Sequence, residues 1–353
     1  MHLVAEQGLL RVKRLRPRDS ATAAQWDKFV MACPTATFFH RAGWQNILRD
    51  IFGLDTYFLY VERDGYIQGV LSLGHVKSWL FGNSLTSLPF TVYGGVAVLT
   101  ADAADALECE AQQIAERLGV AHLELRNFDA RHMEWPTQDL YVTFRKEILP
   151  REDSNLQAIP RKQRAMVRKG INNGLVSELD SDVERFFKLY SDNVHRHGTP
   201  AMPKRYFEAL RAEFATDCDV LTVTASNGRA LSSVLTFYFR DEVLPYYAGD
   251  DESARALAAN DFKYWELMRR SCARGFKLFD FGRSKQGTGS YSFKKNWGFE
   301  PKPLHYEYCL YKRDAIPQNN PSNTKYKLLI SVWRRMPISL ANWLGPHIVR
   351  NLG

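Results

Sequence analysis

The chain has 353 residues, of which 45% are hydrophobic and 24% charged, as is typical of a globular protein and not of a disordered one. At ~100–200 residues per domain, this length predicts two domains or one large domain. The net charge is +8, but residues 312–353 hold seven basic residues and one acidic residue, which disfavours a protein that coats nucleic acid along its whole length.

The five cysteines are odd in number and spread along the chain without a Cys-x-x-Cys pair. This usage indicates buried thiols in a reducing compartment. The first residues show no apolar run of the secretory type, and no stretch reaches the ~18 apolar residues of a membrane-spanning helix. We therefore expect a cytoplasmic protein.

In chain order, the first recognisable elements form a pattern that occurs twice. Each copy has an amphipathic helix, a β-rich run, a two-residue turn and a second β-rich run. Asp-Gly and Asn-Gly predict tight hairpins, because both central residues of a type I′ turn need positive φ. The copies are residues 44–73, with the turn Asp64-Gly65, and residues 206–235, with the turn Asn227-Gly228.

A helix, a glycine and a strand follow each copy. The helices are expected at 106–118 and 262–274, with Gly119 and Gly275 at their ends. Strands are expected at 122–126 and 277–281. The ordered matches favour a duplication, so we predict an α+β protein with domains at residues 1–148 and 149–312, and a linker and basic tail at 313–353.

Several well-known motifs are absent from the sequence. It contains no phosphate-binding GxxxxGK[ST] loop, no HExxH metal motif and no GxSxG nucleophile motif. His195 and His197 have the spacing of a metal pair but lack a Cys/His partner cluster, so no metal site is predicted.

The densest group of candidate site residues lies at 246–308. Asp280 interrupts an apolar strand pattern, where a carboxylate is unfavourable unless it is paired, and Arg283 follows near the strand end. The next loop has two glycines, Lys285, Lys294 and Lys295, and such a loop can bring backbone N–H groups and cations to an oxyanion. The alternative is a structural pair with solvated lysines.

A second basic group opens the second predicted domain. At helical spacing, Arg161, Arg164 and Arg168 share one face. Guanidinium groups bind phosphate bidentately, so this face suits a phosphate-bearing substrate. A solvated helix face is the alternative.

The run 280–301, DFGRSKQGTGSYSFKKNWGFEP, resembles the C-terminal signature of FemAB-like transferases. More narrowly, it resembles the FemAB-related proteins of exosortase (PEP-CTERM) and exopolysaccharide systems. The resemblance covers most of the chain, including residues 159–175, 197–207, 258–270 and 327–353. It implies two tandem GNAT-like (acyl-CoA N-acyltransferase-like) domains, each with a mixed sheet flanked by helices.

The resemblance also implies acyl or aminoacyl transfer to an amine or hydroxyl of a cell-envelope or exopolysaccharide precursor. Lys294 matches the lysine that stabilises the tetrahedral intermediate in the family, and Arg161, Lys162 and Arg164 match the region that meets the phosphates of a nucleotide-linked precursor. The donor stays open between acyl-CoA and aminoacyl-tRNA, with no tightly bound cofactor and no metal. Two alternatives are a small-molecule N-acetyltransferase that uses acetyl-CoA and a non-catalytic protein that binds glycan or tRNA.

The remaining expected roles complete this hypothesis. Asp280 orients the loop through Arg283 or accepts a proton, and Lys285 binds substrate. Three tyrosines, Tyr246, Tyr247 and Tyr291, line the pocket, unless they only pack on strand faces.

The tail has an apolar face interrupted by Arg334, Arg335 and Pro337. Tryptophan and arginine at such a boundary suit a membrane surface, so residues 327–353 are a candidate for peripheral contact with the inner face of the cytoplasmic membrane. Docking on the second domain is the alternative. The apolar face consists of Leu328, Leu329, Val332, Trp333, Met336, Leu340, Trp343 and Leu344.

Overall fold

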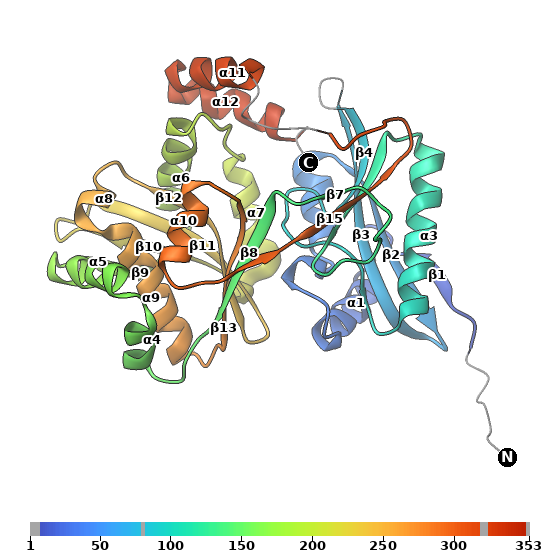
Figure 1. Ribbon diagram of the computed structural model, residues 1–353, viewed down its shortest axis with the longest axis horizontal. Helices are drawn as coiled ribbons and strands as arrows, with labels where there is room; N and C mark the ends of the chain where they lie inside the picture. Colours follow the sequence, from blue (N-terminus) through green and yellow to red (C-terminus); the bar gives the residue numbers. More distant parts are fainter. Residues whose placement is uncertain (1–7, 79–81, 318–323, 351–353) are drawn as a thin grey trace. The chain divides into compact units, whose positions relative to one another are not determined.

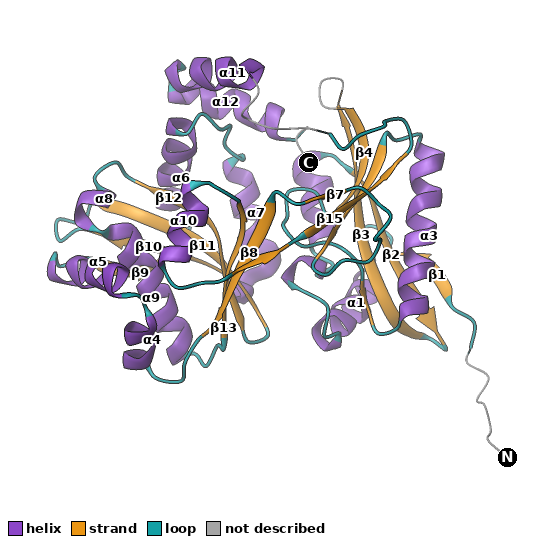
Figure 2. Ribbon diagram, viewed as in Figure 1, coloured by secondary structure: helices purple, strands orange, loops and turns teal. Residues whose placement is uncertain are grey.

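The computed structural model describes residues 8–78, 82–317 and 324–350 (Figure 1). Its contacts divide the chain into two compact units. Among the described residues, the first unit comprises 8–139 and 304–317, and the second comprises 140–303 and 324–350. Each unit is built on one mixed sheet flanked by helices (Figure 2).

The first unit has the strand order β1-β2-β3-β4-β6-β15-β7, with β5 paired to β3. Helix α3 packs on the face that carries Leu59 and Leu71, and α1 places Trp26 against Phe58 on the opposite face. Its strands are β1 Arg11–Arg14, β2 Asp55–Arg63, β3 Tyr66–Ser78, β4 Gly82–Ser87, β5 Ala97–Val98, β6 His122–Asn127, β7 Thr137–Gln138 and β15 His305–Leu310. Its helices are α1 Ser20–Ala32, α2 Trp44–Asn46 and α3 Ala101–Leu118, with a 3-10 turn at Phe38–His40 and a π-helical turn at Ile47–Ile51.

The second unit has the strand order β14-β8-β13-β12-β11-β10-β9. Helices α4, α5 and α9 lie together on one side of this sheet (Figure 1), and α6 and α7 pack on the other. The strands are β8 Tyr141–Glu147, β9 Val176–Leu179, β10 Cys218–Thr224, β11 Ala230–Phe239, β12 Glu242–Asp250, β13 Leu278–Lys285 and β14 Pro301–Pro303. The helices are α4 Glu152–Ala158, α5 Arg161–Asn172, α6 Glu184–Arg196, α7 Lys204–Phe214, α8 Ala254–Leu257, α9 Ala259–Ala273, α10 Gly289–Asn296, α11 Thr324–Arg335 and α12 Ile338–Val349, with a 3-10 turn at Ala215–Asp217.

The two hairpins expected from the duplication are present but differ in their turns. Asp64 and Gly65 both have positive φ, as a type I′ turn requires. In the second hairpin Gly228 has positive φ and Asn227 does not, and the Gly228 N–H donates to the Ala225 carbonyl. The type I′ expectation is therefore wrong for this turn, because one extra residue converts it into a β-turn followed by a glycine bulge.

The sheets cut the chain differently from the boundaries expected at residues 148 and 312. Strand β8 precedes residue 148 but pairs with β13 and β14 in the second sheet. Strand β15 precedes residue 312 but pairs with β6 and β7 in the first sheet. A strand pattern shows which residues are extended and not which sheet they join, so these two pairings could not be predicted from local sequence.

The C-terminal helices are also not a separate segment. Both α11 and α12 contact α6, and Gly345 lies so close to the Ala201 carbonyl that an added Cβ would be 3.0 Å from that oxygen. The tail is thus docked on the second unit. The side chains of Leu328 and Leu329, which the sequence analysis places on the apolar face, lie outside the described residues.

Candidate functional site

Strand β13 carries a one-residue bulge next to the buried carboxylate expected at Asp280. In its pairing with β8, Asp280 stands opposite Arg145 and Arg283 stands opposite Thr143. Three steps along β13 therefore match two along β8, and Gly282 takes up the difference with a φ of +64°. Glycine enters this left-handed region without the steric penalty of a Cβ.

The Asp280 carboxylate, which is 1% exposed, holds this bulge from one side. It accepts a hydrogen bond from the Gly282 N–H at 2.7 Å and one from the Thr143 hydroxyl at 3.4 Å. The Arg145 guanidinium lies 3.3 Å from it and also pairs with Glu242. These partners compensate the buried charge and fix the orientation of the Asp280 carboxylate.

Lys294 holds the same bulge from the other side. It lies on α10, whose first turn is capped by the Thr288 hydroxyl. Its ammonium donates to three consecutive carbonyls, those of Phe281 at 2.7 Å, Gly282 at 3.1 Å and Arg283 at 3.0 Å. Burial lowers the pKa of Lys294 to about 7, although the Asp280 charge acts in the opposite direction.

The Lys294 ammonium has three hydrogens, and these three carbonyls account for all of them. To donate to a substrate oxygen, Lys294 has to exchange one of the carbonyls for that oxygen. The pKa near 7 places both the ammonium and the free amine within reach at neutral pH. The arrangement thus suits a group that changes hydrogen-bond partner or protonation state during a reaction.

Next to this bulge, the parallel strands β12 and β13 separate. They are paired at only two positions, Glu242 with Leu278 and Val243 with Phe279, in ranges that are fully described. Further along β12, its pairing with β11 shifts by one residue, because Leu235 pairs with Tyr247 and Thr236 pairs with Pro245. Ligands of α/β sheets bind beyond the carboxyl ends of parallel strands, so this divergence marks where a ligand can approach the sheet.

In the first unit, the corresponding pair of parallel strands has its ends hydrogen-bonded to other parts of the chain. Strands β4 and β6 are parallel as well, but the Arg126 N–H donates to the Ser87 hydroxyl at 2.7 Å. The Arg126 carbonyl then accepts from the N–H groups of Gly94 and Gly95 at 3.2 and 3.0 Å. Because these strand-end groups of β6 are satisfied internally, the second unit is the better candidate for a transfer site.

The structure separates the three expected pocket tyrosines. The Tyr247 hydroxyl bonds that of Tyr206 at 3.0 Å, and its ring packs on Phe207 of α7. Tyr246 packs against Tyr247 at 4.7 Å, so both belong to the aromatic layer between β12 and α7. Tyr291 instead lies on α10 with its ring 5.4 Å from Phe144, in the core that includes Lys294's neighbours.

Two further expected residues lie at the C-terminal half of β13. The Arg283 guanidinium lies 4.4 Å from the centre of the Tyr141 ring on β8. Lys285 is half-buried at the last position of the strand, before the turn that contains Gly287. Both positions lie on the C-terminal side of Gly282, where Asp280 and Lys294 hold the bulge.

The basic face of α5 lines a pocket of about 440 Å³, as its helical spacing suggests. Arg161 and Arg164 line it, whereas Lys162 does not. Gly170 on the opposite face packs so closely on Phe262 of α9 that an added Cβ would be 2.7 Å from the Phe262 Cβ. The remaining lining residues are Ala165, Arg168, Lys169, Asn172 and Asn173.

A buried ion pair that sequence reasoning missed lies at the end of β12. Lys263 is 0% exposed, and its ammonium lies 3.0 Å from the Asp250 carboxylate, which also accepts from the Ser232 hydroxyl. The pair joins the end of β12 to α9. Its sequence signal is a lysine between Phe262 and Tyr264 in an otherwise apolar helix turn.

Two absences concern the described residues only. Within residues 8–78, 82–317 and 324–350, no group of three or more His, Cys, Asp or Glu side chains could hold a metal ion. No helix in the same ranges is both long and apolar enough to cross a bilayer.

Comparison with known families and proteins gives three kinds of similarity. An Acetyltransferase (GNAT) domain model matches residues 156–295, which lie in the second unit. The UDP-N-acetylmuramoylpentapeptide-lysine N(6)-alanyltransferase of Weissella viridescens is 24% identical over 136 residues. That match spans 38% of this chain and 40% of the relative, so less than half of the relative's length is covered.

The similarity to solved structures covers more of the chain. FemX has a TM-score of 0.64 at 15% identity, covering 86% of this chain and 98% of FemX. A tandem GNAT protein from the clavulanic acid biosynthesis pathway has a TM-score of 0.53 at 11% identity, covering 87% and 100%. The prediction of an α+β protein with two tandem GNAT-like sheets is confirmed. The match of residues 156–295 to an acetyltransferase domain supports an acyltransferase activity of the second unit.

Proposed function

We propose that the second unit transfers an acyl or aminoacyl group from an activated donor to an amine or hydroxyl of a cell-envelope or exopolysaccharide precursor. The observation that carries this proposal is the position of Lys294, a buried lysine with a pKa near 7 on the bulge beside the separating strands β12 and β13. The match of residues 156–295 to an acetyltransferase domain also supports a transfer site in the second unit.

In the proposed reaction, the acceptor nitrogen or oxygen attacks the donor carbonyl carbon directly. The new C–N or C–O bond forms, the C–S bond of a thioester or the C–O bond of an ester breaks, and the proton of the acceptor leaves with the departing thiol or hydroxyl. Lys294 releases one backbone carbonyl and donates to the oxyanion. Asp280 acts as a positioning residue, because it holds the Gly282 N–H and thereby the bulge.

The donor is acyl-CoA or aminoacyl-tRNA as co-substrate, with no tightly bound cofactor. The name of the Weissella viridescens relative, which describes alanyl transfer to a lysine of a UDP-linked precursor, favours an aminoacyl donor. The matching acetyltransferase domain favours acyl-CoA, and with it a small-molecule N-acetyltransferase as the second candidate function. A narrower relation to PEP-CTERM and exopolysaccharide systems stays a prediction.

The α5 pocket is proposed to hold the phosphates of the acceptor. Arg161 and Arg164 line it, and Lys162 is exposed next to it. Guanidinium groups match phosphate oxygens in a bidentate geometry. Arg283, Lys285 and Tyr291 are proposed to contact substrate at the bulge, whereas Tyr246 and Tyr247 shape the site from the aromatic layer behind β12.

We further propose a cytoplasmic enzyme that touches the inner face of the membrane through its C-terminal helices. Trp343 is 66% exposed, and Leu340, Val332 and Ile338 are exposed as well. Arg334 and Arg335 lie at the end of the same helix as Val332. An exposed apolar face with neighbouring arginines matches an anionic lipid surface.

The test is donor consumption by the purified full chain, with acyl-CoAs and charged tRNAs offered separately and envelope-precursor extract as acceptor. We expect Lys294→Met to lose about 10²–10³ in turnover, as removal of an oxyanion donor does. Lys295→Met is the matched control, since Lys295 is the exposed neighbour on the same helix. Equal turnover in wild type and Lys294→Met would overturn the site, and Lys294→Met has to melt cooperatively for the comparison to count. If no donor is consumed while glycan or tRNA is bound, the chain is a non-catalytic binding protein.

A further inference from the structure

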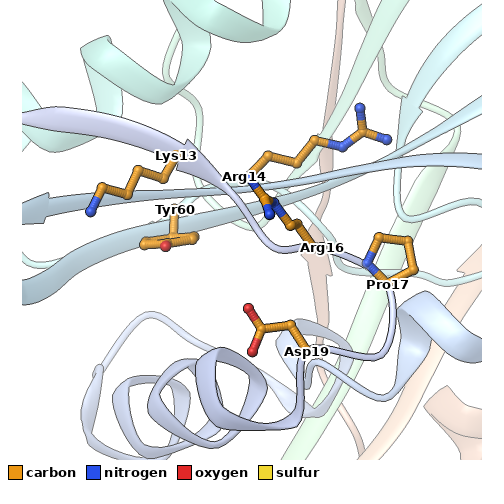
Figure 3. A pocket seen from close by; sticks show the side chains of 6 residues that line it. All are labelled: Lys13, Arg14, Arg16, Pro17, Asp19 and Tyr60. Carbon is orange, nitrogen blue, oxygen red and sulfur yellow. The ribbon is translucent and has the colours of Figure 1, made fainter.

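A pocket that the proposed transfer reaction does not use lies within the first unit. It has a volume of about 780 Å³ and lies between strand β1, strand β2 and the start of α1 (Figure 3). Six residues line it, namely Lys13, Arg14, Arg16, Pro17, Asp19 and Tyr60. Three of these six are cationic, so the lining is positive overall.

The three cations are not equally engaged. Arg14 donates to the Thr56 carbonyl and lies 4.2 Å from the centre of the Tyr57 ring. Lys13 pairs with Glu62 on the neighbouring strand but keeps 46% of its side chain exposed. Within the described ranges, the Arg16 guanidinium makes no hydrogen bond or close ion pair, and its charge acts on the Asp19 carboxylate of the same pocket, whose pKa it helps to lower. Arg16 is thus the cation with most capacity for a ligand, and Lys13 is the second.

The single acid of the pocket is already occupied. The Asp19 carboxylate accepts from the Thr22 N–H at 3.0 Å and from the Thr22 hydroxyl at 2.8 Å, and so caps helix α1. These hydrogen bonds lower the pKa of Asp19, so it stays ionised. Because its charge faces the positive end of the helix dipole, it offsets the pocket's cations only in part.

Tyr60 adds a flat apolar surface beside the cations. It stands directly opposite Lys13 in the β1–β2 ladder, so the two side chains leave the sheet on the same face, as Figure 3 shows. Its ring is held by Trp26 at 6.4 Å. Burial raises the pKa of Tyr60, so its hydroxyl remains a hydrogen-bond donor at neutral pH.

We propose that this pocket binds a sugar phosphate, with the phosphate held by Arg16, the sugar ring against Tyr60, and Lys13 adding positive charge at the other side of the ring. A planar guanidinium matches the oxygens of a phosphate group in a bidentate geometry. A tyrosine offers an apolar ring face and a polar hydroxyl to a sugar. The site lies in the first unit and does not depend on the proposed transfer reaction.

The experiment is calorimetric titration of the full chain with glucose 1-phosphate, inorganic phosphate and glucose at two salt concentrations. We expect saturable binding of glucose 1-phosphate that is tighter than that of phosphate, and none of glucose. Arg16→Gln should weaken this binding about tenfold or more, since a charge-assisted hydrogen bond contributes that much. Lys13→Gln and Tyr60→Ala should also weaken it.

Arg11→Gln is the matched control, because Arg11 lies on the same strand, is exposed and does not line the pocket. Equal losses in Arg11→Gln and Arg16→Gln would show diffuse attraction to a basic strand and overturn the proposal. It would also be overturned by the absence of saturable binding, or by equal affinities for phosphate and glucose 1-phosphate.

Discussion

Asp280 and Lys294 bind the two backbone polar groups of one residue, Gly282. The Asp280 carboxylate accepts from the Gly282 N–H at 2.7 Å, and the Lys294 ammonium donates to the Gly282 carbonyl at 3.1 Å. The two charged side chains therefore fix the β13 bulge between them. Any change at one of them has to affect the other through this backbone.

Asp280→Asn tests that coupling through the pH dependence of the reaction. The amide oxygen can still accept from Gly282, but the negative charge that raises the pKa of Lys294 is gone. We expect the pKa of Lys294 to fall below its value of about 7, so the ammonium is lost at lower pH. The alkaline limb of the kcat profile should then move to lower pH.

The control for this variant is Glu300→Gln, which removes one exposed carboxylate beyond α10. Its kcat profile should match that of the wild type. An unshifted alkaline limb in Asp280→Asn, with activity retained, would contradict the assignment of that limb to Lys294.

Lys294 also predicts how stability depends on pH. Its folded pKa of about 7 is below the value of about 10.4 in an unfolded chain, so between these values the unfolded state binds more protons. The contribution of Lys294 to the free energy of unfolding therefore rises with pH above about 7, by at most about 1.4 kcal/mol per pH unit. Below pH 7 both states are protonated and this contribution is constant.

Urea denaturation of wild type and Lys294→Met at pH 6.5, 8 and 9.5 measures this effect. The difference between the two unfolding free energies should change in favour of the wild type as pH rises. A difference that stays constant across the three pH values would mean that Lys294 keeps an ordinary pKa in the folded protein.

Much of the second sheet could be predicted from sequence, because apolar spacing and glycine ends are local signals. Gly275 ends α9 and strand β13 follows, as expected. Which sheet β8 and β15 join could not be predicted, since this depends on hydrogen-bond partners far away in the chain. The buried environment of Lys294 could not be predicted either, because it depends on three carbonyls that only the folded bulge brings together.

The Lys263–Asp250 pair predicts a large loss of stability when one partner is removed. Lys263→Met leaves the carboxylate at the end of β12 without its cation. Because the Asp250 side chain is still 29% exposed, we expect a loss of about 2 kcal/mol or more rather than the full penalty of a deeply buried pair. Urea denaturation measures it, and Lys263→Met with Asp250→Asn should recover part of the loss. Equal stability of the single variant and the wild type would refute the structural role of the pair.

We expect the docked C-terminal helices to bind membrane through their outer face, which carries the exposed Trp343. Trp343→Ser removes a 66% exposed ring without touching Gly345, which packs on Ala201. We expect sedimentation with vesicles that contain anionic lipid to drop severalfold, because both the apolar area and the neighbouring arginines contribute to binding. Met133→Ser is the control, since Met133 is 89% exposed in the first unit. Deletion of residues 320–353 should abolish sedimentation, and a full-length chain that never sediments with such vesicles would rule out the contact.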